Sequence, residues 1–124
     1  MEKGKILNLS KFKYAIEGFT AAFKLEPTIK LHLLFAVIVI SFGFFVGLTL
    51  SDWVKVIMLI GSVLAIEFTN TAIEVVVNSF TTVEHPGAKL AKDVSATAVL
   101  VVAVTAAVCG LIIFLPYLFK LGLL

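Results

Sequence analysis

The stretch that decides the fold is residues 31–51, LHLLFAVIVISFGFFVGLTLS, in which no side chain is formally charged at neutral pH. As an α-helix rising 1.5 Å per residue, these 21 residues reach about 31 Å. That length crosses the hydrocarbon core of a bilayer, and so apolar a run is typical of a transmembrane helix. The sequence therefore predicts a first membrane span over about residues 31–50.

Two further spans are expected downstream, over about residues 54–79 and 94–115. Residues 51–53 make a short turn before the second span, and a polar connection over 81–93 separates the second span from the third. Neighbouring spans joined by short connections cross the bilayer in opposite directions, so we expect an antiparallel arrangement of three transmembrane helices.

An amphipathic helix is expected ahead of the first span, over about residues 10–25. Phe12, Ile16, Phe19 and Phe23 follow one another at intervals of four, three and four residues, which places them on one helix face. Such a helix either lies on the membrane surface or packs on protein as an ordinary helix. The apolar character of the remaining chain favours the membrane surface.

The composition of the whole chain agrees with a membrane protein. Of its 124 residues, 60% are hydrophobic and only 15% are charged, and the mean hydropathy is +1.12. A soluble domain is nearer half apolar and a quarter charged, and so short a chain could not bury this much apolar surface alone. We therefore predict one all-α membrane domain over residues 1–124, with a surface helix and three transmembrane helices.

The distribution of lysine predicts the orientation of the chain. Arginine is absent, and six of the ten lysines lie in the first 30 residues, while Lys89 and Lys92 lie in the 81–93 connection. Lys55 and Lys120 mark the opposite ends of the spans. Because basic residues favour the cytoplasmic side, we expect the N-terminus and the 81–93 connection to be cytoplasmic. The net charge of +2 is too small to suggest nucleic-acid binding.

Four polar side chains lie within the expected second span: Glu67, Asn70, Glu74 and Asn78. Their separations of three, four and four residues place them on one helix face. Ionisable groups inside a span usually mark a functional site, although a polar face can also hold neighbouring helices together. Burial disfavours a charged carboxylate, so the deeper Glu67 suits a general base, and the shallower Glu74 suits a Mg²⁺ ligand.

Other candidates lie near the expected cytoplasmic face, each with a simpler alternative. Glu26 is a second acidic candidate or a solvated interfacial charge. Lys92 either contacts phosphate or, more simply, extends its charge to the membrane surface. Asp93 either belongs to the same site or, more simply, caps a helix. His85 is a surface histidine unless it joins them. The glycine-rich phosphate loops of soluble nucleotide-binding proteins, protein-kinase motifs and zinc-ligand spacings are absent from the sequence.

Three segments resemble the prokaryotic diacylglycerol kinase and undecaprenol kinase family of small membrane lipid kinases. They are EFTNTAIEVVV (67–77), HPGAKLAKDVSATAVLV (85–101) and FKYAIEGFTAAFKLEPTIKLHLL (12–34). The motif ExxNxAIE, followed by a loop and an AKD segment, is specific. The resemblance implies a surface helix, three transmembrane helices, a homotrimer with sites between subunits, and a location in the bacterial cell membrane. It also implies the use of MgATP to phosphorylate a lipid hydroxyl.

The resemblance also implies roles for individual residues. Glu67 is similar to the catalytic base, and Asn70 organises the same face. Glu26 and Glu74 are similar to the carboxylates that bind Mg²⁺. The residues expected on the nucleotide side are Lys92 and Asp93, with Tyr14, Glu17 and His85 as weaker candidates. Asn78 stands where the family typically has Asp and is not assigned a catalytic role.

The identity of the lipid stays open between two substrates. The 12–18 segment, the NTAIE string and the 85–93 loop look closer to the undecaprenol kinases than to the diacylglycerol kinases, so undecaprenol is favoured. Residues alone also allow a small ion-conducting or transporter subunit, or a non-catalytic membrane subunit. The clustering of acids toward the lysine-bearing side favours nucleotide chemistry over ion conduction.

Overall fold

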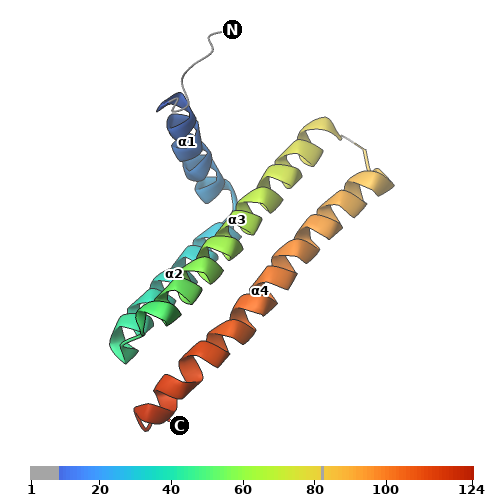
Figure 1. Ribbon diagram of the computed structural model, residues 1–124. Coiled ribbons are helices and arrows are strands. Elements are labelled where there is room, and N and C mark those ends of the chain that lie inside the picture. Colours follow the sequence, from blue (N-terminus) through green and yellow to red (C-terminus); the bar gives the residue numbers. More distant parts are fainter. Residues whose placement is uncertain (1–8, 82) are drawn as a thin grey trace.

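The computed structural model describes residues 9–81 and 83–124, and this part of the chain is helical throughout apart from short connections. The helices are α1 (Leu9–Leu25), α2 (Pro27–Val46), α3 (Leu50–Phe80) and α4 (Pro86–Lys120). The chain passes along α2, turns back along α3 and turns again along α4 (Figure 1). Helix α3 packs against both α2 and α4, while α1 stands at an angle beside the α2–α3 pair (Figure 1).

Three helices are long and apolar enough to cross a membrane, which confirms that expectation. They are α2, α3 and α4, with 20, 31 and 35 residues. At 1.5 Å per residue, α3 and α4 are about 46 and 52 Å long, well beyond the roughly 30 Å of the hydrocarbon core. The polar ends of these two helices therefore extend past the apolar core, and polar residues at the α3–α4 turn can be helical and still be near water.

The helix bounds differ from the expected spans. We expected the first span to reach residue 50, but α2 runs from Pro27 to Val46. Proline is tolerated at the first position of a helix, where its missing N–H has no intrahelical partner, so Pro27 begins α2. Gly47 ends it in the left-handed conformation, with φ of 72° and its N–H bonded to the Gly43 carbonyl. Helix α4 begins at Pro86, ahead of the expected residue 94, because residues 86–93 form polar helical turns.

Helix α1 packs on the rest of the molecule through aromatic side chains. The ring centroid of Phe19 lies 5.5 Å from that of Phe68 on α3, and the Lys30 ammonium lies 5.2 Å from the Phe23 centroid. Phe12 and Ile16, farther along the same face, remain 58% and 67% exposed. A helix that keeps large apolar side chains exposed suits a membrane interface, so its location there stays a prediction.

The end of the molecule opposite the α3–α4 turn is fixed by a polar contact between helices. The Tyr117 hydroxyl donates a hydrogen bond of 2.5 Å to Asp52 Oδ2 and accepts one of 3.1 Å from the backbone N–H of Thr49. Lys55 Nζ donates to Asp52 Oδ1 at 3.1 Å. These bonds join the α2–α3 turn to the C-terminal part of α4 and so fix the axial position of α4 against α3.

Gly43 permits close packing near the same end, which leads to a prediction about stability. A Cβ at position 43 would lie 2.8 Å from Trp53 Cη2 and 2.9 Å from Leu48 Cδ1. Gly43→Ala is therefore expected to destabilise the folded protein by about 1–3 kcal/mol, measured as a lower thermal unfolding midpoint in detergent. Gly61→Ala is the matched control, because a Cβ there meets nothing within 4 Å. Equal midpoints for the two variants would contradict this account of the turn.

Candidate active site

Polar side chains are buried in a chain that buries very few residues. Glu67 is 3% exposed, Thr71 4% and Ser95 7%. Burying a carboxylate or a hydroxyl costs free energy unless it is hydrogen-bonded, and inside a membrane such groups normally face protein or water rather than lipid. Their partners therefore define a candidate site.

Two side chains of α2 approach Glu67 on α3, and one of them is hydrogen-bonded to it. Thr28 Oγ1 donates a hydrogen bond of 2.6 Å to Glu67 Oε1, and His32 Nε2 lies 3.6 Å from Glu67 Oε2. Residues 28 and 32 are one helical turn apart, so one face of α2 presents both side chains to the carboxylate. The two carboxylate oxygens are thus approached separately, and a carboxylate has lone pairs left to accept a proton.

Asn70 continues this polar arrangement from α3 to α4. Its Oδ1 accepts a short hydrogen bond from Ser95 Oγ. Thr71, beside it in sequence, has a buried hydroxyl without a hydrogen-bond partner in the described part of the chain. Three helices therefore meet around Glu67 and Asn70, the two residues predicted to be catalytic. We call this group the buried polar cluster, after its buried members Glu67 and Ser95; it also includes the half-buried His32 and Asn70 and the exposed Thr28.

Three members of the buried polar cluster are not predicted from the sequence: Thr28, His32 and Ser95. The residues 28 and 32 do carry a signal, because they are polar, one turn apart and directly after Glu26. A histidine is formally neutral at pH 7, so His32 does not interrupt an uncharged run. Ser95 gives no such signal, since serine is common in transmembrane helices and its partner lies 25 residues away.

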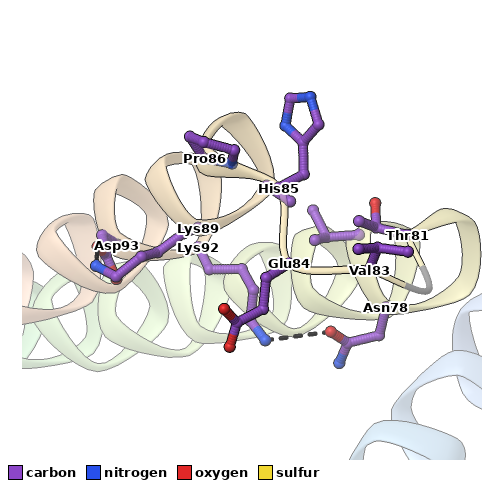
Figure 2. Close-up of a pocket in the computed structure, with 11 residues that line it drawn as sticks. Asn78, Thr81, Val83, Glu84, His85, Pro86, Lys89, Lys92 and Asp93 are labelled. Carbon is purple, nitrogen blue, oxygen red and sulfur yellow. Dashed lines mark hydrogen bonds and ion pairs between the residues drawn. The ribbon is translucent and has the colours of Figure 1, made fainter.

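A hollow of about 790 Å³ opens at the α3–α4 turn (Figure 2). We call it the basic hollow after Lys89 and Lys92, although Glu84 and Asp93 also line it. It is lined by the end of α3, the connection and the first turns of α4, namely Val77, Asn78, Thr81, Val83, Glu84, His85, Pro86, Ala88, Lys89, Lys92 and Asp93. Three residues predicted on the nucleotide side, His85, Lys92 and Asp93, are therefore brought together here.

The two lysines of the basic hollow differ in their partners. Lys89 Nζ forms an ion pair of 2.5 Å with Asp93 Oδ2 in the charged first turns of α4, and this hydrogen bond raises the pKa of Lys89. Lys92 Nζ instead donates a hydrogen bond of 3.1 Å to the neutral amide oxygen of Asn78, which Figure 2 shows across the hollow. Among the described residues Lys92 forms no ion pair, although Glu84 lines the same hollow, so its ammonium remains able to attract an anion such as phosphate.

His85 is the N-cap residue of α4, immediately before Pro86. Its Nδ1 accepts a hydrogen bond of 3.0 Å from the Gly87 N–H and so caps the helix. The same helix N-terminus carries a partial positive charge that favours anions. His85 contributes to the hollow through this cap, which fixes the backbone beside Lys89 and Lys92.

Other predicted residues lie outside both groups. Tyr14 on α1 is 65% exposed, and Glu17 pairs with Lys13 at 4.0 Å, on a helix that does not line the basic hollow. Glu26 precedes α2 and is half-buried, and Glu74 is half-buried on α3. Because α2 and α3 run in opposite directions, residues before Thr28 and residues after Glu67 extend toward the same end of the molecule (Figure 1).

The donor set suits Mg²⁺ held together with a nucleotide. Within residues 9–81 and 83–124, no three His, Cys, Asp or Glu side chains are grouped so as to hold a metal by themselves. Mg²⁺, however, is usually bound by one or two carboxylates together with substrate phosphates and water. Glu26 and Glu74 are carboxylates of the kind that this mode of binding uses, and neither of them lines the basic hollow.

The structure thus defines a small helical protein with three helices able to span a membrane, a buried glutamate in the middle of α3 and a hollow at the α3–α4 turn. The family model for prokaryotic diacylglycerol kinase matches residues 13–114, and the chain belongs to this family. It is 40% identical to the undecaprenol kinase of Bacillus subtilis over 107 residues, which cover 86% of this chain and 87% of the relative. It is 34% identical to the diacylglycerol kinase of Haemophilus influenzae over 93 residues, 75% of this chain and 79% of that relative.

These similarities confirm the resemblance inferred from the sequence. The chain is a lipid kinase of the diacylglycerol kinase and undecaprenol kinase family, and a kinase of this family uses ATP. Membership in an enzyme family leaves the ion-conducting and non-catalytic alternatives without support.

Proposed function

We propose that the protein phosphorylates the hydroxyl group of undecaprenol at the cytoplasmic surface of the bacterial cell membrane. The observation that carries the proposal is the burial of Glu67 among polar residues of three helices, about 16 Å along α3 from Asn78 of the basic hollow. A long-chain alcohol keeps its chain in lipid while its hydroxyl reaches such an acid. The higher identity and coverage of the undecaprenol kinase relative favour this lipid over diacylglycerol.

Glu67 is the proposed general base. As the lipid oxygen forms a bond with the γ-phosphorus of ATP, its hydroxyl proton passes to Glu67, and the bond from the γ-phosphorus to the β–γ bridging oxygen breaks to release ADP. Thr28 holds one carboxylate oxygen of Glu67, and Asn70 is fixed by Ser95 on the same side of α3. Catalysis then rests mainly on positioning and electrostatics, which a small scaffold can supply.

The nucleotide is proposed to bind in the basic hollow. Lys92 contacts the phosphates, and Asp93 and His85 shape the start of α4, with Tyr14 and Glu17 as further candidates. Glu26 and Glu74 would hold Mg²⁺. When bound, the ion neutralises charge on the phosphates during transfer.

The working unit is proposed to be a homotrimer with sites completed between subunits. Tyr14 and Glu17 on α1 do not line the basic hollow of their own chain, which agrees with a site that α1 of a neighbouring subunit completes. Each span also leaves most of its surface exposed, which allows helix contacts between subunits. The lysine distribution supports an orientation with the N-terminus and the basic hollow in the cytoplasm.

The substrate is tested by competition between two lipids. Purified protein in mixed micelles is given labelled ATP, Mg²⁺ and equal amounts of undecaprenol and diacylglycerol, and the labelled lipids are separated. We expect label mainly in undecaprenyl phosphate, and its formation should cease when Mg²⁺ is chelated. Label mainly in phosphatidic acid would identify diacylglycerol as the substrate. Absence of label from both lipids would overturn the proposed function.

A further inference from the structure

His32 stands between the proposed base and an apolar groove. Its Nε2 lies 3.6 Å from Glu67 Oε2, and the side chain is 21% exposed. It also lines a groove of about 610 Å³ between α2, α3 and α4. Every other residue lining this groove is apolar or glycine: Phe35, Ala36, Val39, Val56, Leu59, Ile60, Val63, Leu64, Ala103, Ala106, Ala107, Gly110, Leu111 and Phe114.

The imidazole of His32 is a polar group in an apolar groove and therefore needs a hydrogen-bond partner. The polar group that its Nε2 faces is the carboxylate of Glu67. The distance of 3.6 Å is longer than a hydrogen bond, for which N–H···O separations are about 2.9 Å. A small rotation of the imidazole closes the gap, because the groove side of the ring is not tightly filled. Thr28 already holds Oε1, so a bond from His32 to Oε2 would fix the plane of the carboxylate from both sides.

We propose that His32 is a positioning residue for Glu67, donating a hydrogen bond from Nε2–H to Oε2 while the lipid hydroxyl binds. This inference rests on the proposed role of Glu67 as the base. A neutral imidazole orients the carboxylate and leaves its negative charge in place, so that Glu67 can still accept the hydroxyl proton. His32 does not itself take part in bond making.

Three substitutions of His32 test this role: two introduce a side-chain amide, in glutamine and asparagine, and one introduces the apolar side chain of leucine. Gln at position 32 carries its NH₂ about as far from the backbone as Nε2, whereas Asn reaches only as far as Nδ1. His32→Gln is expected to retain kcat within about 3-fold, while His32→Asn and His32→Leu lose about 10-fold or more because the hydrogen bond to a charged group is lost. The KM for MgATP should stay unchanged in all three, since the basic hollow is formed by other residues.

Ser41→Ala is the matched control, because the Ser41 hydroxyl is a polar group of α2 that bonds only to its own helix, at Val37. Thermal unfolding and particle size in detergent are measured for every variant. If His32→Leu does not fold, the comparison of kcat between His32→Gln and His32→Asn still tests the positioning role.

Equal kcat values for the Gln and Asn variants, or wild-type kcat in all three, would overturn the positioning role. The wild-type protein is assayed alongside with undecaprenol and with diacylglycerol. Lack of transfer by the wild type would instead refute the proposed function, so the two failures are distinguishable.

Discussion

Glu67→Gln is expected to lower the rate of phosphate transfer by about 10²- to 10⁴-fold, the usual contribution of a positioned general base. Glutamine has the shape of glutamate, and its side-chain oxygen can still accept the hydrogen bond that Thr28 donates at 2.6 Å to Oε1. What the substitution removes is the ability to accept the lipid proton. The measurement is transfer of labelled phosphate to lipid, with nucleotide binding followed separately by equilibrium titration.

The control for this variant is Thr69→Val, which is isosteric and two residues away on α3. The Thr69 hydroxyl is exposed and bonds only to the Ala65 carbonyl of its own helix, so activity should be unchanged. Glu67→Gln should also keep the wild-type particle size and bind MgATP normally, because Glu67 does not line the basic hollow. Near-normal transfer by Glu67→Gln would remove Glu67 from its proposed role.

The number and order of the helices could be predicted from sequence, because a long uncharged segment is stable in a bilayer as a transmembrane helix. The helix ends could not be placed as well. The left-handed conformation of Gly47 ends α2 before residue 50, and nothing in the apolar pattern indicates this. The first turns of α4 are helical although polar, since a helix longer than the membrane core can carry its charges beyond it.

The site residues that lie on α3 could be predicted from the sequence, whereas their contacts with α2 and α4 could not. The spacing of Glu67, Asn70 and Glu74 defines a polar face by helical periodicity alone. Which residues of the other helices contact this face, here Thr28 and Ser95, depends on the axial register of α2 and α4 against α3. That register is set by packing and by distant contacts, such as the bond between Tyr117 and Asp52, rather than by any local pattern.

Family resemblance gave the roles of Glu26 and Glu74 but not their geometry. Each is half-buried, and in the described residues neither belongs to a group of three or more side chains that could hold a metal ion. If the site is shared between neighbouring subunits, as we propose, a single chain holds only part of it. Contacts between subunits are not encoded in helical periodicity, and this is the physical reason why the sequence gives no geometry for Glu26, Glu74, Tyr14 and Glu17.

The second large effect is expected from Lys92→Met, which should lower kcat/KM for MgATP by about 100-fold, a loss of the size seen when one electrostatic donor to a transferring group is removed. Methionine keeps the length of the side chain and removes its charge. Lys92 is the relevant cation because its hydrogen-bond partner at 3.1 Å, Asn78, is neutral, whereas the charge of Lys89 is paired with Asp93 at 2.5 Å. A charge without a counterion attracts phosphate more strongly than one already compensated.

Lys55→Met is the matched control, since it removes one lysine from the opposite end of α3, where Lys55 pairs with Asp52. If net charge alone governed nucleotide binding, both variants would raise the KM for MgATP equally. If Lys92 acts at the phosphates, only its loss affects catalysis, and Lys92→Arg should recover part of the activity by restoring the charge. Equal kinetics for Lys92→Met and Lys55→Met would exclude a direct contact between Lys92 and the nucleotide, and would move the phosphate site away from the basic hollow.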